Sequence, residues 1–428
     1  MESNPCKKIK LDQDRNIDFP NEIWSKILKY LPSEDVYQSL SLVSKRFQSL
    51  ALNSGVLRVI KFENLWISKE KMNFLKNSIT PKKFIFCGRS VGIADPNFEV
   101  ISKARNLKSL VVEHSHLAPV AIGALKHSNS KLEHIELQEF DFSGMSEIMI
   151  GISKIKTLKT FRMIDPNMTP DFHKIINAFA ENENQLENIE FDYIIDYDEK
   201  EKSNKLTKAM NNLLEKKSDT LRCLKFVNLL DLRESIDPTV PLTNLKLCQK
   251  LEEFCGALQQ HSIEILAKLP KLKKLKLYRL DNPKCLLDNL NLGQLNYLSI
   301  IGEGLPSTNK EMICQEVQKH YFPNLQRLFL SFMNDDHAKL TEDFFSNLIA
   351  NAPKLKSIQL HDSECPVSHQ FMCNFIKNSN IFVSFSSKSF EDFLREKCID
   401  VFGKYKRMEM TFNDWASNNV EYCDLLWS

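Results

Sequence analysis

Residues 272–278 read Leu-Lys-Lys-Leu-Lys-Leu-Tyr, and residues 325–330 read Leu-Gln-Arg-Leu-Phe-Leu. Both stretches fit the pattern L-x-x-ϕ-x-ϕ, in which ϕ is an apolar residue. Ten copies form a series at intervals of 21 to 35 residues. The copies begin at Leu107, Leu132, Leu158, Leu186, Leu221, Leu251, Leu272, Leu295, Leu325 and Leu355. A period of this length indicates a solenoid, in which each unit buries its apolar face against its neighbours.

Each copy is expected to hold a strand followed by a helix. After Lys273, apolar and polar residues alternate with the period of two that a strand requires. Farther along, Phe344, Leu348 and Ile349 have helical spacing, and Pro353 ends that helix. The copies resemble leucine-rich repeats. This resemblance implies an α/β fold, a horseshoe with parallel strands on the concave face and helices outside.

The copies depart from the leucine-rich-repeat pattern at one position. The family usually has Asn or Cys three residues after the third apolar position, where the side chain bonds loop backbone. This chain has other residues there, for example Ser115, Phe140 and Pro166. We therefore expect the solenoid architecture without the family's asparagine ladder.

The composition excludes several classes of protein. The 428 residues are 43% apolar, which is ample for a continuous core, and the net charge is only +2. Nucleic acid is therefore an unlikely partner. The first residues have no apolar signal-peptide core, and no stretch has the apolar length of a membrane span. The 11 cysteines include no C-x-x-C pair. These features predict a cytoplasmic or nuclear protein with reduced thiols.

A compact helical block precedes the repeats, at residues 18–53. Pro20 stands where a helix can begin, because the first turn leaves its missing N–H unused. Ile23, Ile27, Tyr30 and Leu31 then fall on one face of that helix. A block of about 35 residues is too small to stabilise itself well. Its surplus of apolar faces indicates a protein partner.

The block resembles the F-box family in four ordered motifs: Phe19-Pro20-x-Glu22-Ile23, Ile27-Leu28-x-x-Leu31-Pro32, Asp35-Val36 and Val43-Ser44-Lys45-Arg46-Phe47. Phe19 departs from the usual Leu but keeps an apolar anchor. F-box followed by leucine-rich repeats is a recognised subclass of this family. The resemblance implies docking on the Skp adaptor of an SCF-type cullin–RING ubiquitin ligase. The repeats would then bind a protein substrate for ubiquitination.

By the same resemblance, the adaptor contacts are Phe19, Pro20, Ile23, Ile27, Leu28, Leu31 and Val36. The alternative is that these residues only pack the inside of the block. In such a ligase the RING subunit and the conjugating enzyme transfer ubiquitin. The chain would therefore be a non-catalytic subunit that needs no cofactor.

The outward residues of the strands would line the concave face. Early copies offer mostly acidic side chains, with Glu113, His134, Glu136, Arg162, Glu190 and Asp192. Later copies offer a basic and aromatic set, from which we select as candidate substrate contacts Lys274, Lys276, Tyr278, Tyr297, Arg327 and Phe329. Such a surface suits an acidic or phosphorylated peptide. The alternative is a solvated face, with the substrate bound by a C-terminal cap.

Two rival functions follow from the same sequence. One is a leucine-rich-repeat scaffold or transport adaptor with no ligase role. The other is an enzyme that uses the concave face, but no P-loop, H-E-x-x-H or G-x-S-x-G motif occurs. The pair His114 and His116 lacks further ligands at suitable spacing, so no metal site is expected.

The domain boundaries expected from these patterns divide the chain into five parts. Residues 1–17 form a disordered tail that includes Lys7-Lys8-Ile9-Lys10, a short basic run similar to a nuclear localisation signal. The F-box spans 18–53 and a helical connector spans 54–80. The repeats span 81–386, with PKKFIFCG at 81–88 and IFVSF at 381–385 as weaker first and last strands. A cap spans 387–428.

Overall fold

The structure is a computed structural model of the 428-residue chain. It describes residues 19–31, 35–36, 39, 43–53, 59–63, 82–87, 106–113, 131–141, 146–167, 172–193, 200–228, 242–257, 260–278, 280, 283–302, 307–332, 340–361, 371, 375, 379 and 381–385. The chain divides into two compact units, the N-terminal unit Met1–Phe161 and the C-terminal unit Arg162–Ser428.

The N-terminal unit begins with two described helices, α1 (Asn21–Leu28) and α4 (Lys45–Asn53). Four strands follow: β1 (Val59–Glu63), β2 (Lys83–Cys87), β3 (Ser109–Glu113) and β4 (His134–Asp141). Helix α8 spans Ser146–Ser153, and β5 (Thr160–Asn167) lies at the division between the units. Strands β1 to β4 pair in parallel, each with the next along the chain.

The C-terminal unit alternates strands with helices. Its strands are β6 (Asn188–Tyr193), β7 (Cys223–Asn228), β8 (Glu253–Gly256), β9 (Lys274–Tyr278), β10 (Tyr297–Ile301), β11 (Arg327–Ser331), β12 (Ser357–His361) and β13 (Phe382–Phe385). Its helices are α9 (Phe172–Glu181), α10 (Lys200–Lys217), α11 (Gln260–Ala267), α12 (Pro283–Asn289), α13 (Ser307–Lys319) and α14 (Glu342–Asn351), with a 3-10 helix η4 (Thr243–Leu247).

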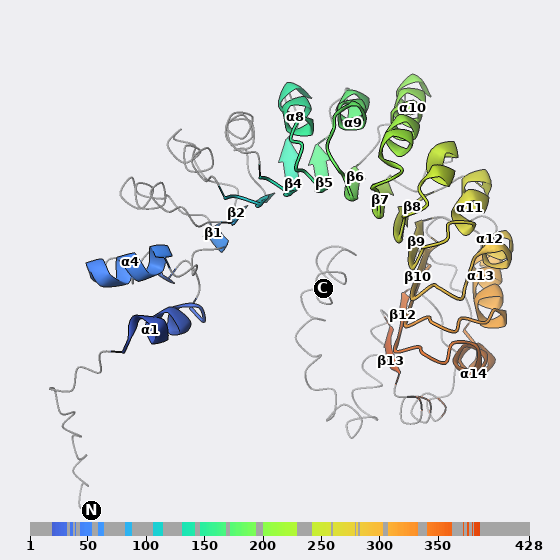
Figure 1. Cartoon of the computed structure of the whole chain (residues 1–428). Helices are drawn as coiled ribbons and strands as arrows, with labels where there is room; N and C mark the ends of the chain where they lie inside the picture. Colours follow the sequence, from blue (N-terminus) through green and yellow to red (C-terminus); the bar gives the residue numbers. More distant parts are fainter. Residues whose placement is uncertain are drawn as a thin grey trace, which may run out of the picture. The chain divides into compact units, whose positions relative to one another are not determined.

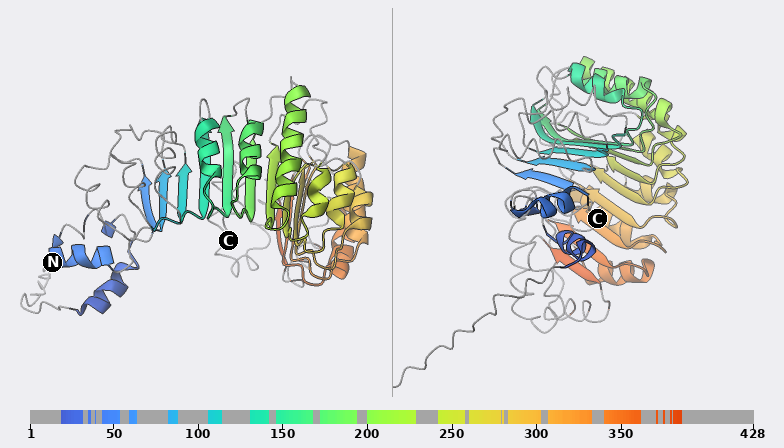
Figure 2. Two further views of the ribbon diagram at one scale, coloured as in Figure 1. Left: turned by 45° about the horizontal axis from the view of Figure 1, so that its top comes forward. Right: turned by 60° about the vertical axis from the view of Figure 1, so that its left-hand side comes forward.

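Strands and helices of the C-terminal unit form two separate layers. Strands β6 to β13 pair in parallel in the order of the chain. In Figure 1 they line the concave side of this unit, and helices α9 to α14 lie on its convex side. Figure 2 shows the same two layers from two further directions. The predicted fold class is confirmed: a leucine-rich-repeat solenoid follows a short helical block in the sequence.

The apolar positions of the repeats form the core between the two layers. Leu272, Leu275 and Leu277 are almost completely buried, and so are Leu325, Leu328 and Leu330. Helix α14 covers its repeat with Phe344, Phe345 and Leu348, which are also buried. The Thr341 hydroxyl accepts a hydrogen bond from the Phe344 N–H at 3.4 Å and so caps this helix. The helix ends at Asn351, as Pro353 predicted.

A backbone ladder joins neighbouring repeats at the start of their strands. At nine places among the described residues, one carbonyl oxygen accepts hydrogen bonds from two consecutive N–H groups of the next repeat. Glu252, for example, accepts from Lys273 at 2.8 Å and from Lys274 at 3.0 Å. The acceptors are Lys82, Lys108 and Glu133 in the N-terminal unit, and Glu187, Arg222, Glu252, Lys273, Asn296 and Gln326 in the other.

Side chains add a second link between some repeats. Thr157 donates its hydroxyl hydrogen to the Leu132 carbonyl at 2.8 Å, and Thr220 donates to the Leu186 carbonyl at 2.7 Å. Each threonine directly precedes the first leucine of its own repeat and reaches the first leucine of the repeat before. Both links satisfy backbone acceptors inside the solenoid, where a missing partner would be costly.

The expected helical connector at 54–80 needs a correction. Residues 59–63 form strand β1, which pairs with β2 from Val59↔Lys83 to Glu63↔Cys87. The stretch Val-Ile-Lys-Phe-Glu is rich in β-branched and aromatic residues, and Ile60 is fully buried while Val59 is exposed. The first strand therefore precedes PKKFIFCG, which contains β2, whereas IFVSF contains β13 as expected.

Several expectations concern residues outside the described ones. These are the tail at 1–17 with Lys7-Lys8-Ile9-Lys10, most of the connector, the pair His114 and His116, and the cap at 387–428. Among the helices that the structure describes, none is long and apolar enough to cross a bilayer.

Candidate functional site

The six candidate substrate contacts lie on one face of three neighbouring strands. The register places them in three rows across β9, β10 and β11: Lys274–Tyr297–Arg327, Lys276–Ser299–Phe329 and Tyr278–Ile301–Ser331. Side chains two residues apart on a strand point to the same side of the sheet, and paired strands are about 4.8 Å apart. The alternation read from the sequence therefore brings all six candidates to one surface, on the side of the strands away from the helices.

This strand face is more buried than an open binding surface. A cluster of buried residues lies on β8 to β11 and just beyond β8, and we call it the strand-face cluster: Cys255, Ala257, Tyr278, Ile301 and Phe329. Tyr278 is only 8% exposed and Phe329 only 5%. By contrast, Lys274 and Arg327 are exposed, and Lys276 and Tyr297 are half-buried. The face thus has an apolar centre and a basic edge.

Two ion pairs centre on Glu253 of β8, at the side of the strand face nearest β7. Glu253 on β8 lies 3.1 Å from the ammonium nitrogen of Lys225 and 3.3 Å from that of Lys274. Burial acts to raise the pKa of Glu253, but attraction to the two lysines outweighs it and holds the pKa below its ordinary value. Burial likewise acts to lower the pKa of Lys225, and Glu190 and Glu253 more than offset it.

The cysteines on this face are unsuited to nucleophilic catalysis. Burial raises the pKa of Cys255 to about 11, and it raises the pKa of Cys223 still further. Both side chains are therefore protonated thiols at neutral pH, and the thiolate is the reactive form. Cys255 lies 4.0 Å from the Tyr278 hydroxyl, while the Lys276 ammonium lies 5.3 Å from the centre of the Tyr278 ring. These contacts pack the centre of the face.

The outward residues of the earlier strands are largely engaged with one another. His134 lies 3.3 Å from Glu136 within β4, and Glu136 also accepts from Gln138. Arg162 on β5 lies 2.7 Å from Glu190 on β6. The Arg162–Glu190 ion pair offsets one of the negative charges expected there.

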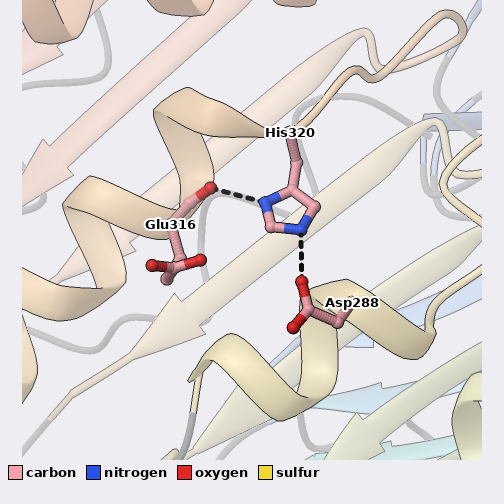
Figure 3. A group of neighbouring side chains, drawn as sticks. All are labelled: Asp288, Glu316 and His320. Atoms are coloured by element: carbon pink, nitrogen blue, oxygen red, sulfur yellow. Dashed lines mark hydrogen bonds and ion pairs between the residues drawn. The ribbon is translucent and has the colours of Figure 1, made fainter.

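One histidine bridges two helices of the outer layer. His320 follows α13, and its Nδ1 lies 2.9 Å from the Glu316 carbonyl oxygen, while its Nε2 lies 3.1 Å from an Asp288 carboxylate oxygen on α12 (Figure 3). Both ring nitrogens thus face oxygen atoms that can accept a hydrogen bond. The Glu316 carboxylate lies 2.9 Å from Lys319. The three side chains could meet at a cation, yet these contacts already account for them as a link between α12 and α13.

The helical block is held together by one aromatic stack and one arginine. Trp24 on α1 contacts Phe19 and Phe47 edge-on, with ring centres 5.5 and 4.9 Å apart. Arg46 on α4 donates to the Asn21 side chain and to the Phe19 carbonyl, both at 2.9 Å. The Ser44 hydroxyl accepts from the Phe47 N–H at 3.2 Å at the start of α4. These contacts fix α1 against α4.

The same block leaves a line of apolar side chains exposed. Ile23, Ile27 and Leu31 are 39%, 37% and 37% exposed, and Tyr30 is 91% exposed. We call these four residues the α1 stripe. They lie at positions i, i+4, i+7 and i+8, so they share one face of α1 and the turn after it. Contiguous exposed apolar side chains of this kind mark an interaction surface.

A comparison with protein-family models decides what this block is. The model described as "F-box domain" matches residues 17–58. The chain carries an F-box domain. The match extends one residue before and five residues beyond the expected span of 18–53, and it confirms the resemblance read from the four motifs.

Two further comparisons concern the whole chain. No curated protein matches the sequence. Among solved structures, the chain is similar to a yeast structure titled "Crystal structure of Rad7 and Elc1 complex in yeast". The identity is 14% and the TM-score is 0.49, over 87% of this chain and 94% of that chain.

The F-box residues named from the sequence fall into two groups. Phe19, Pro20, Ile23, Ile27 and Leu31 are exposed, so a partner can reach them. Leu28 is 1% exposed and Val36 is fully buried. These two side chains therefore pack the inside of the F-box, and a partner cannot contact them without opening the domain.

Sequence reasoning missed the buried centre of the strand face. Ser299, Ile301 and Ser331 occupy outward positions between the named candidates, and all three are buried. Ile301 did carry a signal, because an apolar residue at an outward position of a strand indicates a covered surface. The two serines carried none, because short polar residues are common on exposed faces.

Proposed function

We propose that this protein is the substrate-recognition subunit of an SCF-type ubiquitin ligase. Its F-box docks on a Skp-type adaptor, and its repeats bind the protein to be ubiquitinated. It takes no part in the chemistry of transfer. Its contribution is to raise the effective concentration of substrate lysines near the conjugating enzyme. We expect a protein with this role to act in the cytoplasm or the nucleus.

The observation that carries the proposal is the exposed α1 stripe on a domain that matches the F-box model. Burying a side chain such as Ile or Leu contributes about 1.5–3 kcal/mol. Ile23, Ile27 and Leu31 are already more than half buried, so each can contribute only a part of this value, and the exposed Tyr30 adds to it on binding an apolar groove. The folded F-box uses Leu28 and Val36 for its own core, so the stripe is available for that partner.

The strand face supports the second half of the proposal. Its exposed basic edge, Lys274 and Arg327, lies beside half-buried Tyr297 and the buried aromatic centre. Arginine and aromatic residues are favoured in interaction hot spots. An acidic or phosphorylated segment of the substrate fits this combination, because the cations pair with its charges and the rings bury its apolar side chains.

Affinity capture of the intact chain from cells, with the proteasome inhibited, tests this function. An Ile27→Lys, Leu31→Lys variant is captured in parallel. The proposal expects the intact chain to bring down a Skp-type adaptor, a cullin and ubiquitinated proteins. The variant should retain substrate proteins and lose the adaptor and cullin. Capture of partners without any adaptor or cullin by the intact chain would instead favour a repeat scaffold without a ligase role.

A further inference from the structure

The centre of the strand face is covered although the described helices lie on the other side of the sheet. Phe329 on β11 shows this most clearly. Its neighbours in the same row are Ser299 on β10 and Gln359 on β12, and neither is large enough to cover a phenyl ring. Phe329 is nevertheless 5% exposed, and Ile301 beside it is 4% exposed. In Figure 1 helices α11 to α14 lie outside these strands.

Two serine hydroxyls on this face lack a hydrogen-bond partner among the described residues. Ser299 is fully buried and Ser331 is 1% exposed, and the Oγ atom of each has no partner. A buried polar group without a partner costs about 1–3 kcal/mol. The two serines stand on β10 and β11, beside the strand-face cluster. Their positions indicate that the occupant of this face carries hydrogen-bonding groups, as the backbone of an extended segment does.

The charged side chains around the strand-face cluster indicate that its occupant carries negative charge. Lys274, Lys276 and Arg327 lie on β9 and β11, and Lys225 lies on β7. Two carboxylates lie among these cations: Glu253 pairs with Lys225 and Lys274, and Glu190 attracts Lys225. The four cations outnumber these two carboxylates, and an acidic segment with apolar side chains complements the face.

Among the stretches outside the described residues, one long segment has this composition. Residues 408–428 read MEMTFNDWASNNVEYCDLLWS. They include four carboxylates, at Glu409, Asp414, Glu421 and Asp424, and no Lys, Arg or His. They also include four large aromatic residues, at Phe412, Trp415, Tyr422 and Trp427. We call residues 408–428 the acidic segment.

The acidic segment is also within reach of the strand face. Strand β13 ends at Phe385, so 22 residues (386 to 407) separate it from the segment. These can span up to roughly 70–80 Å when extended, at about 3.3–3.6 Å per residue. The distance from β13 to β9 across the sheet is four strand spacings, or roughly 19 Å. The tether therefore allows docking within one molecule.

We propose that the acidic segment docks on the strand face of its own chain, over β8 to β11. Its carboxylates face the basic edge, its aromatic side chains cover the strand-face cluster, and its backbone bonds Ser299 and Ser331. The segment thereby occupies the surface assigned above to substrate. Its regulatory consequence rests on that proposed function: an acidic substrate must displace the segment, whose tethering gives it a high effective concentration.

Hydrogen exchange of the full-length chain tests the docking. Docked residues should exchange at least about tenfold more slowly than an unstructured peptide of the same sequence. Protection should be lost in a Glu409→Lys, Asp414→Lys variant and in a Lys274→Glu, Arg327→Glu variant. A variant with all four changes should regain part of the protection, because the segment is then basic where the strand face is acidic. A Lys271→Glu variant, at an exposed lysine before β9, should leave protection unchanged.

Carbodiimide cross-linking of a mixture of isotopically light and heavy chains identifies which copy docks. The proposal expects links from Lys274 or Lys276 to carboxylates of the acidic segment within one chain. If the acidic segment of the unchanged protein exchanges its amide hydrogens as fast as the unstructured peptide does, the docking is overturned. Links that join light to heavy chains would overturn docking within one molecule. Neither assay involves the adaptor, so both results are independent of whether the F-box binds it.

Discussion

Ser299 on β10 lies opposite Phe329 on β11, and both side chains are buried on the side of the sheet away from the helices. In a leucine-rich-repeat solenoid the strands normally bury only their helix-facing side chains, and the outward ones meet solvent. Here part of the outward side is buried too, at Cys255, Tyr278, Ile301 and Phe329. Stability and binding therefore both depend on this face, and substitutions on the two sides of the same strand can be compared directly.

The first prediction separates the two sides of β9. Leu275 faces the helices and is fully buried, whereas its neighbour Lys276 faces outward and is half-buried. Leu275→Ala should lower the free energy of unfolding by about 2–5 kcal/mol, because it leaves a cavity in the core. Lys276→Ala should change it by less than about 1 kcal/mol. Chemical denaturation measures both, and equal losses would contradict the strand register.

The second prediction concerns the links between repeats. Thr220→Val removes the hydroxyl that donates to the Leu186 carbonyl at 2.7 Å, and it nearly preserves the side-chain shape. The unfolding free energy should fall by about 1–2 kcal/mol, because the carbonyl loses its side-chain donor. Thr220→Ser keeps the hydroxyl, so its unfolding free energy should fall by less. If both variants lose the same amount, the shape of the side chain matters more than the bond.

The third prediction is a pH dependence that comes from Glu253. Attraction to Lys225 and Lys274 holds its folded pKa below the ordinary value of 4.5. The unfolded chain therefore binds the proton more tightly than the folded protein does. The resulting stabilisation is fully present above about pH 4.5 and is lost as the pH falls through the folded pKa.

Thermal unfolding of the protein and a Glu253→Gln variant from pH 6 to pH 3 measures this contribution. The difference in melting temperature between the two should shrink as the pH falls through this range. Lys274→Gln, which removes one of the two attracting charges, should show an intermediate dependence. A difference that stays constant down to pH 3 would show that the ion pairs do not stabilise the fold.

The amino-acid sequence predicted most of the fold because its signals are local and repeated. The spacing of Leu272, Leu275 and Leu277 identifies the buried side of a strand, and ten copies of it identify a solenoid. The F-box motifs are similarly ordered. Strand β1 was missed although Leu57, Ile60 and Phe62 fit the same pattern, because this copy lies 50 residues before the copy at Leu107, about twice the usual interval.

The candidate site was only partly predictable, because burial depends on contacts distant in the sequence. Alternation placed Tyr278 and Phe329 on the outward side, and nothing in their own strands indicates that this side is covered. Leu28 and Ile27 are adjacent apolar residues in one motif, yet only packing against α4 distinguishes the buried one from the exposed one. The side chains of Ser299 and Ser331 became informative only when their burial was known.

The most direct test of the proposed function is the affinity of the purified chain for a purified Skp-type adaptor, measured by titration calorimetry. An Ile27→Lys, Leu31→Lys variant should bind at least about 100-fold more weakly, because two unpaired charges would enter an apolar interface. A Lys26→Gln, Lys29→Gln variant changes polar neighbours of the α1 stripe and should bind like the unchanged protein. Unchanged affinity of the Ile27→Lys, Leu31→Lys variant, or no binding by the unchanged chain, would contradict the proposed docking.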